Sequence, residues 1–251
     1  MPMSQLAIAS ENPPWSGWDV ARIAALTLAM IFVFVLLVTF AAERFLYPKL
    51  AIMDVAKFPM VSVLAQLGAY LVVLGFMYAL ATRSGLGFWK AVNWNWPRYA
   101  SYYVVAGMAF SVGLQGLARL LPMPKSLPID KFFQTPLDAW VLSIFGMTVA
   151  PLLEELFFRG FLYPVLVRRL GTFLAIVLTA ASFSLIHVPQ LARSWGPVLI
   201  VFLIGLALTI IRAVTKSVAA GVLTHMAYNG TISMLLFMAS GGFRHLEKLA
   251  Q

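Results

Sequence analysis

The chain has 251 residues, of which 61% are hydrophobic and only 11% are charged. A soluble domain of this length would carry about 25% charged residues, so the composition excludes that class. Long apolar segments instead predict an integral, multi-pass membrane protein that is solvated by the lipid bilayer. The net charge of +9 would suggest a nucleic-acid partner for a soluble chain. Here the basic residues lie between the apolar segments, facing anionic head groups, so we expect no nucleic-acid partner.

Seven mostly apolar segments follow one another, each near the length of about 20 residues needed to cross a bilayer. They cover residues 23–42, 60–81, 99–121, 137–163, 171–188, 196–213 and 217–239. The loop 83–98 combines three tryptophans with lysine and arginine, which is typical of the head-group level, and a short interfacial helix is expected there. The sequence therefore predicts an all-α, polytopic transmembrane helix bundle of about seven spans, within a range of six to eight.

This pattern divides the chain into four regions. They are a polar N-terminal segment (1–22), N-terminal transmembrane helices with their loops (23–134), a core of helices (135–240) and a polar tail (241–251). Seven spans would place the termini on opposite sides of the membrane, but Lys and Arg divide about equally between the sides and give no orientation. No internal repeat of the kind common in transporters is present. The absence of cysteine excludes thiolate chemistry.

Ionisable residues inside apolar segments are informative, because each costs about 2.5–3.5 kcal/mol at a helix centre and needs a partner or a function. Glu154 and Glu155 lie in APLLEELFFRGFLYP, and on a helix their side chains diverge by about 100°. Glu155 precedes Arg159 by four residues, the favoured order for a helical ion pair. We therefore predict that Arg159 keeps Glu155 ionised, while Glu154 is free to hold or move a proton. Alternatively, all three form one buried ion cluster that only orders the helix.

Two histidines lie in the apolar segments that follow. His187 ends the sequence SFSLIH, where it could be an interfacial residue with a hydrogen-bond partner. His225 and Asn229, in THMAYNG, are four residues apart on one helical face and can reach the same point. They could instead form a hydrogen-bonded pair that packs two helices together. The third histidine, His245, is expected to be solvated in the polar tail.

A carboxylate and two imidazoles that converge inside a bundle can activate a water molecule. Glu154, His187 and His225 could ligate Zn²⁺ and leave a fourth position for that water. Without a metal, Glu154 would be the general base, and a histidine or Asn229 would donate hydrogen bonds to the developing oxyanion. The residues alone leave both mechanisms open.

Three motifs, in order, resemble those of the CPBP intramembrane proteases. EELFFR is similar to EExxxR, FSLIH to FxxxH and HMAYN to HxxxN. The family groups eukaryotic CAAX prenyl endopeptidases with bacterial relatives linked to bacteriocin processing and self-immunity. The resemblance covers about residues 135–240 and implies hydrolysis of a peptide or membrane-protein substrate within or beside the bilayer.

The resemblance also implies roles for the site residues. Glu154 would activate the water and His187 would assist it or bind metal. His225 and Asn229 would bind metal or stabilise the oxyanion, and Glu155 with Arg159 would support the site. The family resemblance does not decide between zinc and a metal-free glutamate mechanism.

Two alternatives from other functional classes stay open. One is a non-catalytic membrane immunity or scaffold protein, because the family includes such members. The other is a proton-coupled transporter with Glu154, Glu155, His187 and His225 as a relay, although an asparagine adds little to a relay. The small size and compact loops favour a bacterial cell membrane as the location.

Overall fold

In a computed structural model of the chain, residues 12–124 and 126–247 are described, and every regular element among them is a helix. This confirms the predicted all-α class. The elements are α2 (Gly17–Phe45), α3 (Ile52–Val55), α4 (Pro59–Thr82), α5 (Phe88–Ala91), α6 (Ala100–Ala118), η1 (Pro128–Phe132), α7 (Pro136–Met147), α8 (Val149–Glu155), η2 (Leu156–Leu162), α9 (Tyr163–Leu170), α10 (Thr172–His187), η3 (Val188–Leu191), α11 (Trp195–Thr215) and α12 (Val218–Ala239).

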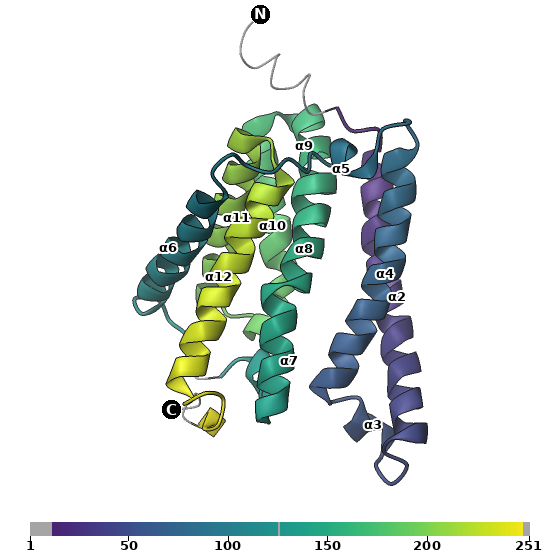
Figure 1. Cartoon of the computed structure of the whole chain (residues 1–251), viewed down its shortest axis with the longest axis vertical. Coiled ribbons are helices and arrows are strands. Elements are labelled where there is room, and N and C mark those ends of the chain that lie inside the picture. Colours follow the sequence, from purple (N-terminus) through teal and green to yellow (C-terminus); the bar gives the residue numbers. More distant parts are fainter. Residues whose placement is uncertain (1–11, 125, 248–251) are drawn as a thin grey trace, which may run out of the picture.

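Six helices of the described residues are long and apolar enough to cross a membrane, which lies within the predicted range. They are α2, α4, the composite helix from α7 to α9, α10 with η3, α11 and α12. The expected span 99–121 forms α6, a helix of 19 residues with small and polar side chains, which is not among the six. In Figure 1, α2 begins at the upper end of the molecule and α12 ends at the lower end.

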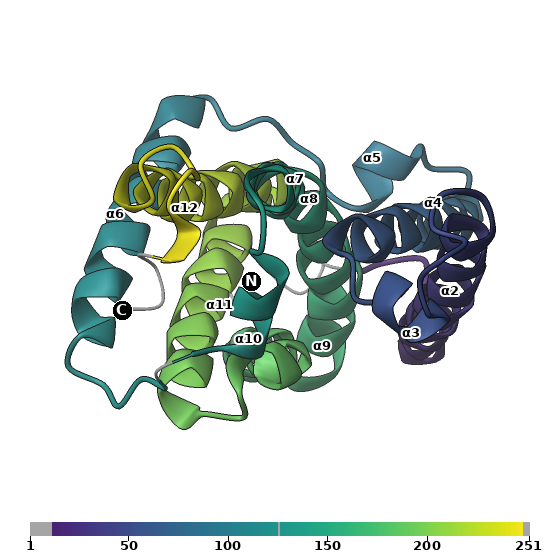
Figure 2. The same ribbon diagram turned by 90° about the horizontal axis from the view of Figure 1, so that it is seen from below.

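The helices form two groups, which Figures 1 and 2 show from two directions. The helices α2 and α4 form an antiparallel hairpin on one side, and those from α7 to α12 form the core on the other. The helix α6 packs along the outer side of α12. Gly107 permits this close packing, because a Cβ atom there would collide with the carbonyl oxygen of Thr224.

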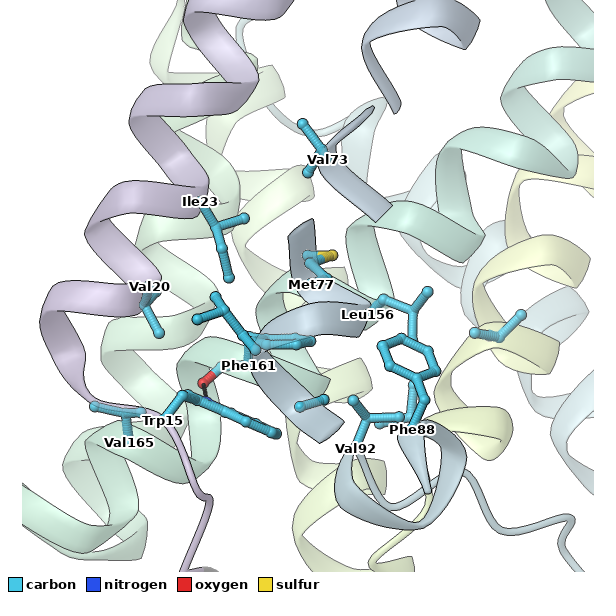
Figure 3. Close-up of a cluster of buried hydrophobic side chains, with 14 residues drawn as sticks. Trp15, Val20, Ile23, Val73, Met77, Phe88, Val92, Leu156, Phe161 and Val165 are labelled. Atoms are coloured by element: carbon cyan, nitrogen blue, oxygen red, sulfur yellow. Dashed lines mark hydrogen bonds between the residues drawn. The ribbon is translucent and has the colours of Figure 1, made fainter. Parts of the chain in front are cut away.

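A buried apolar cluster joins the hairpin to the core (Figure 3). Ile23 from α2 and Met77 from α4 meet Leu156 and Phe161 from the π-helical segment η2. Trp15 stacks on Phe161 with 4.2 Å between the ring centroids and donates its Nε1–H to the Phe161 carbonyl at 3.0 Å. The cluster therefore anchors the hairpin on the segment that follows the two adjacent glutamates.

Prolines shape the composite helix that carries those glutamates. Within the predicted span 137–163, the α-helix breaks at Thr148, three residues before Pro151, and opens into the π-helix η2 directly after Glu155. Pro164 lacks the N–H that would bond to the Gly160 carbonyl, which favours the wider π-helical turn before it. Since π-helical turns are frequent at functional sites, the position of η2 directly after Glu155 indicates that a functional site lies at the two glutamates.

The N-terminal segment, the loop 83–98 and the polar tail can be compared with their predictions. The helix α2 begins inside the predicted N-terminal segment, because Ser16 caps it in a capping box with Asp19. The predicted interfacial helix is α5. His245 is half-exposed and pairs with Glu247 at 3.1 Å, as expected for a solvated residue. Residues 1–11 and 248–251 of the two polar end segments lie outside the described residues.

Candidate active site

Glu155 and Arg159 form the ion pair that their spacing predicts. Arg159 Nη1 donates to Glu155 Oε1 at 2.7 Å, and both side chains are fully buried. His225 Nδ1 lies 3.0 Å from the same oxygen and joins α12 to the pair. Hydrogen bonds from a guanidinium and an imidazole to a carboxylate are of the strong, charge-assisted kind. Glu155 is therefore engaged and has no free charge for other chemistry.

The second carboxyl oxygen of Glu155 lies against the backbone of α12. A Cβ atom at Gly221 would be 2.7 Å from Glu155 Oε2, so only glycine leaves room for the carboxylate there. Oε2 has no hydrogen-bond partner among the described residues. The position of Glu155 thus depends on the glycine opposite it as well as on the partners of Oε1.

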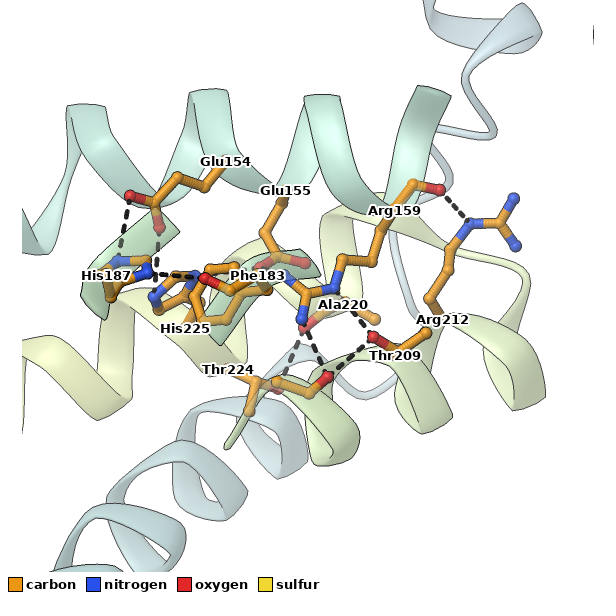
Figure 4. A network of polar contacts seen from close by, with 11 residues as sticks. Glu154, Glu155, Arg159, Phe183, His187, Thr209, Arg212, Ala220, Thr224 and His225 are labelled. Atoms are coloured by element: carbon orange, nitrogen blue, oxygen red, sulfur yellow. Dashed lines mark hydrogen bonds and ion pairs between the residues drawn. The ribbon is translucent and has the colours of Figure 1, made fainter. Parts of the chain in front are cut away.

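Glu154 lies between two histidines that come from two other helices (Figure 4). Its Oε1 is 3.9 Å from Nε2 of His187 at the end of α10, and its Oε2 is 3.8 Å from Nε2 of His225 on α12. These separations are too long for direct hydrogen bonds and suit a bridging water. The Glu154 side chain is 18% exposed, whereas the Glu155 side chain is fully buried. The two adjacent acids therefore differ in environment as the sequence predicts.

The hydrogen bonds at the far side of each imidazole fix where its proton lies. His187 Nδ1 is 2.8 Å from the carbonyl oxygen of Phe183, which can only accept, so Nδ1 carries the hydrogen. His225 Nδ1 faces ionised Glu155 and donates for the same reason. In the neutral form of both histidines, the Nε2 lone pair is left facing Glu154.

Asn229 lies one turn beyond His225 on α12 and has a different partner. Its Nδ2 donates to the Gly146 carbonyl of α7 at 2.7 Å, close to the break at Thr148. Within the described residues its side chain makes this hydrogen bond and no other. One of its two amide hydrogens is thus used to tie α12 to α7, and the other stays available.

Glu154, His187 and His225 offer the oxygen and nitrogen atoms that zinc binds. In this arrangement, however, those atoms are too far apart to coordinate one zinc ion. Zinc ligands lie about 2.0–2.2 Å from the ion, so two ligands of a tetrahedral ion are about 3.3–3.6 Å apart. The two nitrogen–oxygen separations here are 3.9 and 3.8 Å. Among the described residues no group of three or more His, Asp or Glu is placed to hold a metal ion.

Buried polar residues on α11, which lie outside the three sequence motifs, complete the site. Arg159 Nε donates to Thr209 Oγ1 at 3.2 Å, and Arg159 Nη2 donates to the Gly205 carbonyl at 2.9 Å. Arg212 Nε in turn donates to the Arg159 carbonyl at 3.2 Å. The available signal was the spacing of four and three residues, which places Gly205, Thr209 and Arg212 on one helical face in an apolar segment.

Comparison with known proteins agrees with the motifs. Residues 136–231 match the family model described as type II CAAX prenyl endopeptidase Rce1-like, and the match includes all six predicted site residues. The match agrees with the family resemblance of the three motifs and covers less than half of the chain. No curated protein and no solved structure matches the chain. With the six apolar helices, the match supports an integral membrane protein of a protease family.

Proposed function

We propose that the chain is an intramembrane endopeptidase in which Glu154 is the general base that activates water. The observation that carries the proposal is the placement of the Glu154 carboxylate between two Nε2 atoms, at 3.9 and 3.8 Å, while Glu155 is held by Arg159. A carboxylate that is partly accessible, without a cation of its own, and beside two oriented imidazoles is suited to moving a proton. The match to a CAAX endopeptidase family supports the same reaction class.

In the proposed reaction, a water molecule bridges Glu154 and the imidazoles. Glu154 takes one proton as the water oxygen forms a bond to the carbonyl carbon of the substrate. His187 Nε2 accepts the second hydrogen of the water and orients the attacking lone pair. The proton on Glu154 then passes to the amide nitrogen as the carbon–nitrogen bond breaks. The products are a carboxylic acid and an amine, and no step runs through a metal.

We assign stabilisation of the oxyanion to His225 and Asn229. His225 Nδ1 is bound to Glu155, and in the imidazolium form of the ring its Nε2–H would donate to the developing oxyanion. Asn229 has one amide hydrogen that is not used on Gly146 and can add a second donor. Removing one donor of this kind typically lowers kcat about 10²–10³-fold.

The proposed substrate is a peptide segment presented at the membrane. The family match and the apolar surroundings of Glu154 support prenylated C-terminal peptides, leader peptides and the tails of membrane proteins as the classes to assay. The small size and the compact loops support a bacterial cell membrane as the location.

The test compares Glu154→Gln with the wild type and with Glu43→Gln, a matched change in the hairpin helix α2. Each protein is purified in detergent, stripped of metal, and assayed on fluorogenic peptides of the three classes with and without added Zn²⁺. We expect cleavage by the wild type and Glu43→Gln, and a loss of at least about 10²-fold in Glu154→Gln.

Each result has a defined meaning. If the metal-stripped wild type cleaves peptides only after Zn²⁺ is added, the metal-free mechanism is overturned but the assignment as a protease stands. Full activity of Glu154→Gln would overturn the role of Glu154. If the wild type cleaves nothing and Glu154→Gln also keeps the cellular function, the scaffold or immunity alternative replaces the enzyme.

A further inference from the structure

We propose that Thr209 of α11 is a positioning residue for the proposed hydrolysis. It holds Arg159, and through Arg159 it fixes Glu155 and the tautomer of His225. The inference rests on the proposed function but adds a helix that none of the three motifs includes. It is carried by hydrogen bonds between side chains that are fully buried.

The hydroxyl of Thr209 has a defined direction. It donates its single hydrogen to the Gly205 carbonyl at 2.7 Å, within its own helix. Its remaining lone pairs therefore accept from Arg159 Nε at 3.2 Å, and the hydroxyl cannot donate elsewhere. The same Gly205 carbonyl also accepts from Arg159 Nη2 at 2.9 Å. One threonine and one carbonyl thus bind two edges of the same planar guanidinium (Figure 4).

An aromatic ring also packs against the plane of the Arg159 guanidinium. The Phe183 ring lies 4.7 Å below Arg159 Cζ, in cation–π distance. With Nε and Nη2 fixed on α11, Nη1 is directed at Glu155 Oε1 at 2.7 Å. Arg159 lies in the π-helical segment η2. These contacts therefore determine the direction of its side chain.

The position of Arg159 reaches the reacting atoms in two further steps. Glu155 Oε1 accepts from both Arg159 Nη1 and His225 Nδ1, so a shift of the guanidinium shifts the carboxylate that binds the imidazole. The contact of His225 Nδ1 with Glu155 holds the imidazole in the position where its Nε2 faces Glu154. Thr209 therefore acts on the water-activating group although it contacts neither histidine.

Thr209→Val is the informative change because it keeps the shape and removes the acceptor. The Nε–H of a fully buried arginine would then have no partner, and the guanidinium would turn to find one. Thr209→Ser restores the hydroxyl. The matched control is Thr179→Val on the adjacent helix α10. Thr179 is also fully buried, but its hydroxyl has no hydrogen-bond partner among the described residues.

The experiment measures kcat, KM and the pH profile of kcat for the wild type and these three variants, per folded molecule counted by active-site titration. We expect Thr209→Val to lower kcat about 10- to 100-fold with little change in KM, and to move the pH profile. Thr209→Ser and Thr179→Val should stay within about threefold of the wild type. The proposal is overturned if Thr209→Val keeps the wild-type kcat, or if Thr179→Val loses as much.

A second readout does not require cleavage and separates this inference from the proposed function. Nitrogen-15 spectra of the histidine rings report which nitrogen carries the proton, and the chain has three histidines. We expect His225 to carry its proton on Nδ1 in the wild type and to lose that preference in Thr209→Val. An unchanged His225 spectrum in Thr209→Val overturns the proposal. If the His225 spectrum changes in Thr209→Val but the wild type cleaves no peptide, the network is upheld and the proposed function is the part that fails.

Discussion

The hairpin of α2 and α4 and the core from α7 to α12 hold together in different ways. Mean hydropathy is 2.8 and 2.0 in the two hairpin helices and 1.6, 1.8, 2.5 and 1.2 in the four spans of the core, so α12 is the least apolar of the six. The hairpin buries small apolar residues of α4, such as Ala65 and Ala69, against α2. Its ion pairs lie near its ends, where Asp19 meets exposed Arg22 and Arg83 and, in the segment that connects the two helices, Asp54 meets Lys57. The core instead buries charged groups completely.

The difference follows from the solvent. Lipid tails are as apolar as leucine, so apolar packing gives helices in a bilayer little preference for one another, and small residues or polar contacts must supply it. The hairpin uses small residues, and the core uses Glu155, Arg159 and Arg212. The same type of substitution should therefore lower the free energy of unfolding more in the core than in the hairpin.

The largest effect is expected from Arg159→Met. Arg159→Met removes the cation of a buried ion pair and leaves the Glu155 carboxylate with only the His225 imidazole as partner; breaking a buried pair in this way typically costs about 3–5 kcal/mol. The same change at Arg22, whose side chain is 67% exposed, should cost less than about 1 kcal/mol because solvent screens its pair with Asp19. Unfolding midpoints in mixed micelles give both values. Equal losses at the two sites would contradict the contrast between the core and the hairpin.

The next effect is expected from Gly221→Ala. The new Cβ atom would be 2.7 Å from Glu155 Oε2, so the carboxylate must move away from His225, at a cost of about 1–3 kcal/mol. The hairpin control is Gly75→Ala on α4, where a Cβ atom would meet nothing within 4 Å. That change should be neutral or stabilise by up to about 1 kcal/mol, since alanine is the better helix former. A neutral Gly221→Ala would show that the carboxylate is not confined.

The same contrast explains what the sequence could predict. Glu155 and Arg159 are four residues apart, so local helix geometry was enough to pair them. The three motifs placed Glu154, His187 and His225 in successive helices, and the structure brings all three together. Charges in apolar segments are rare, which made these residues visible.

What the sequence could not predict depends on contacts between distant segments. Thr209 is 50 residues from Arg159, and threonine in an apolar helix is ordinary, so only its spacing from Arg212 on one helical face set it apart, and its partner could not be predicted. The partner of Asn229 is a backbone carbonyl that no side-chain pattern reveals. The segment 99–121 was expected to be a span. It forms α6, which contains small and polar residues and is not among the six helices apolar enough to cross a membrane, although it packs along α12.

A smaller effect is expected where the two regions meet. Trp15→Phe keeps the stacking on Phe161 but removes the 3.0 Å hydrogen bond to its carbonyl, which should cost about 1 kcal/mol. Trp18→Phe is the control, because Trp18 is 76% exposed and should change stability by less than about 0.5 kcal/mol. Thermal melting in detergent measures both. If Trp15→Phe is as neutral as Trp18→Phe, the cluster alone anchors the hairpin.

The smallest effect on stability is expected from Asn229→Leu, and it separates structure from chemistry. The bond from Asn229 Nδ2 to the Gly146 carbonyl joins two helices, and such contacts average about 0.6 kcal/mol in membranes, with a maximum near 1.7. Gln66→Met in the hairpin is the control, because Gln66 bonds to the Ser62 carbonyl of its own helix. If Asn229 also donates to the oxyanion, kcat should fall about 10²-fold, far more than this loss of stability explains. A kcat that falls only in proportion to the folded fraction would assign Asn229 to helix packing and leave His225 as the oxyanion donor.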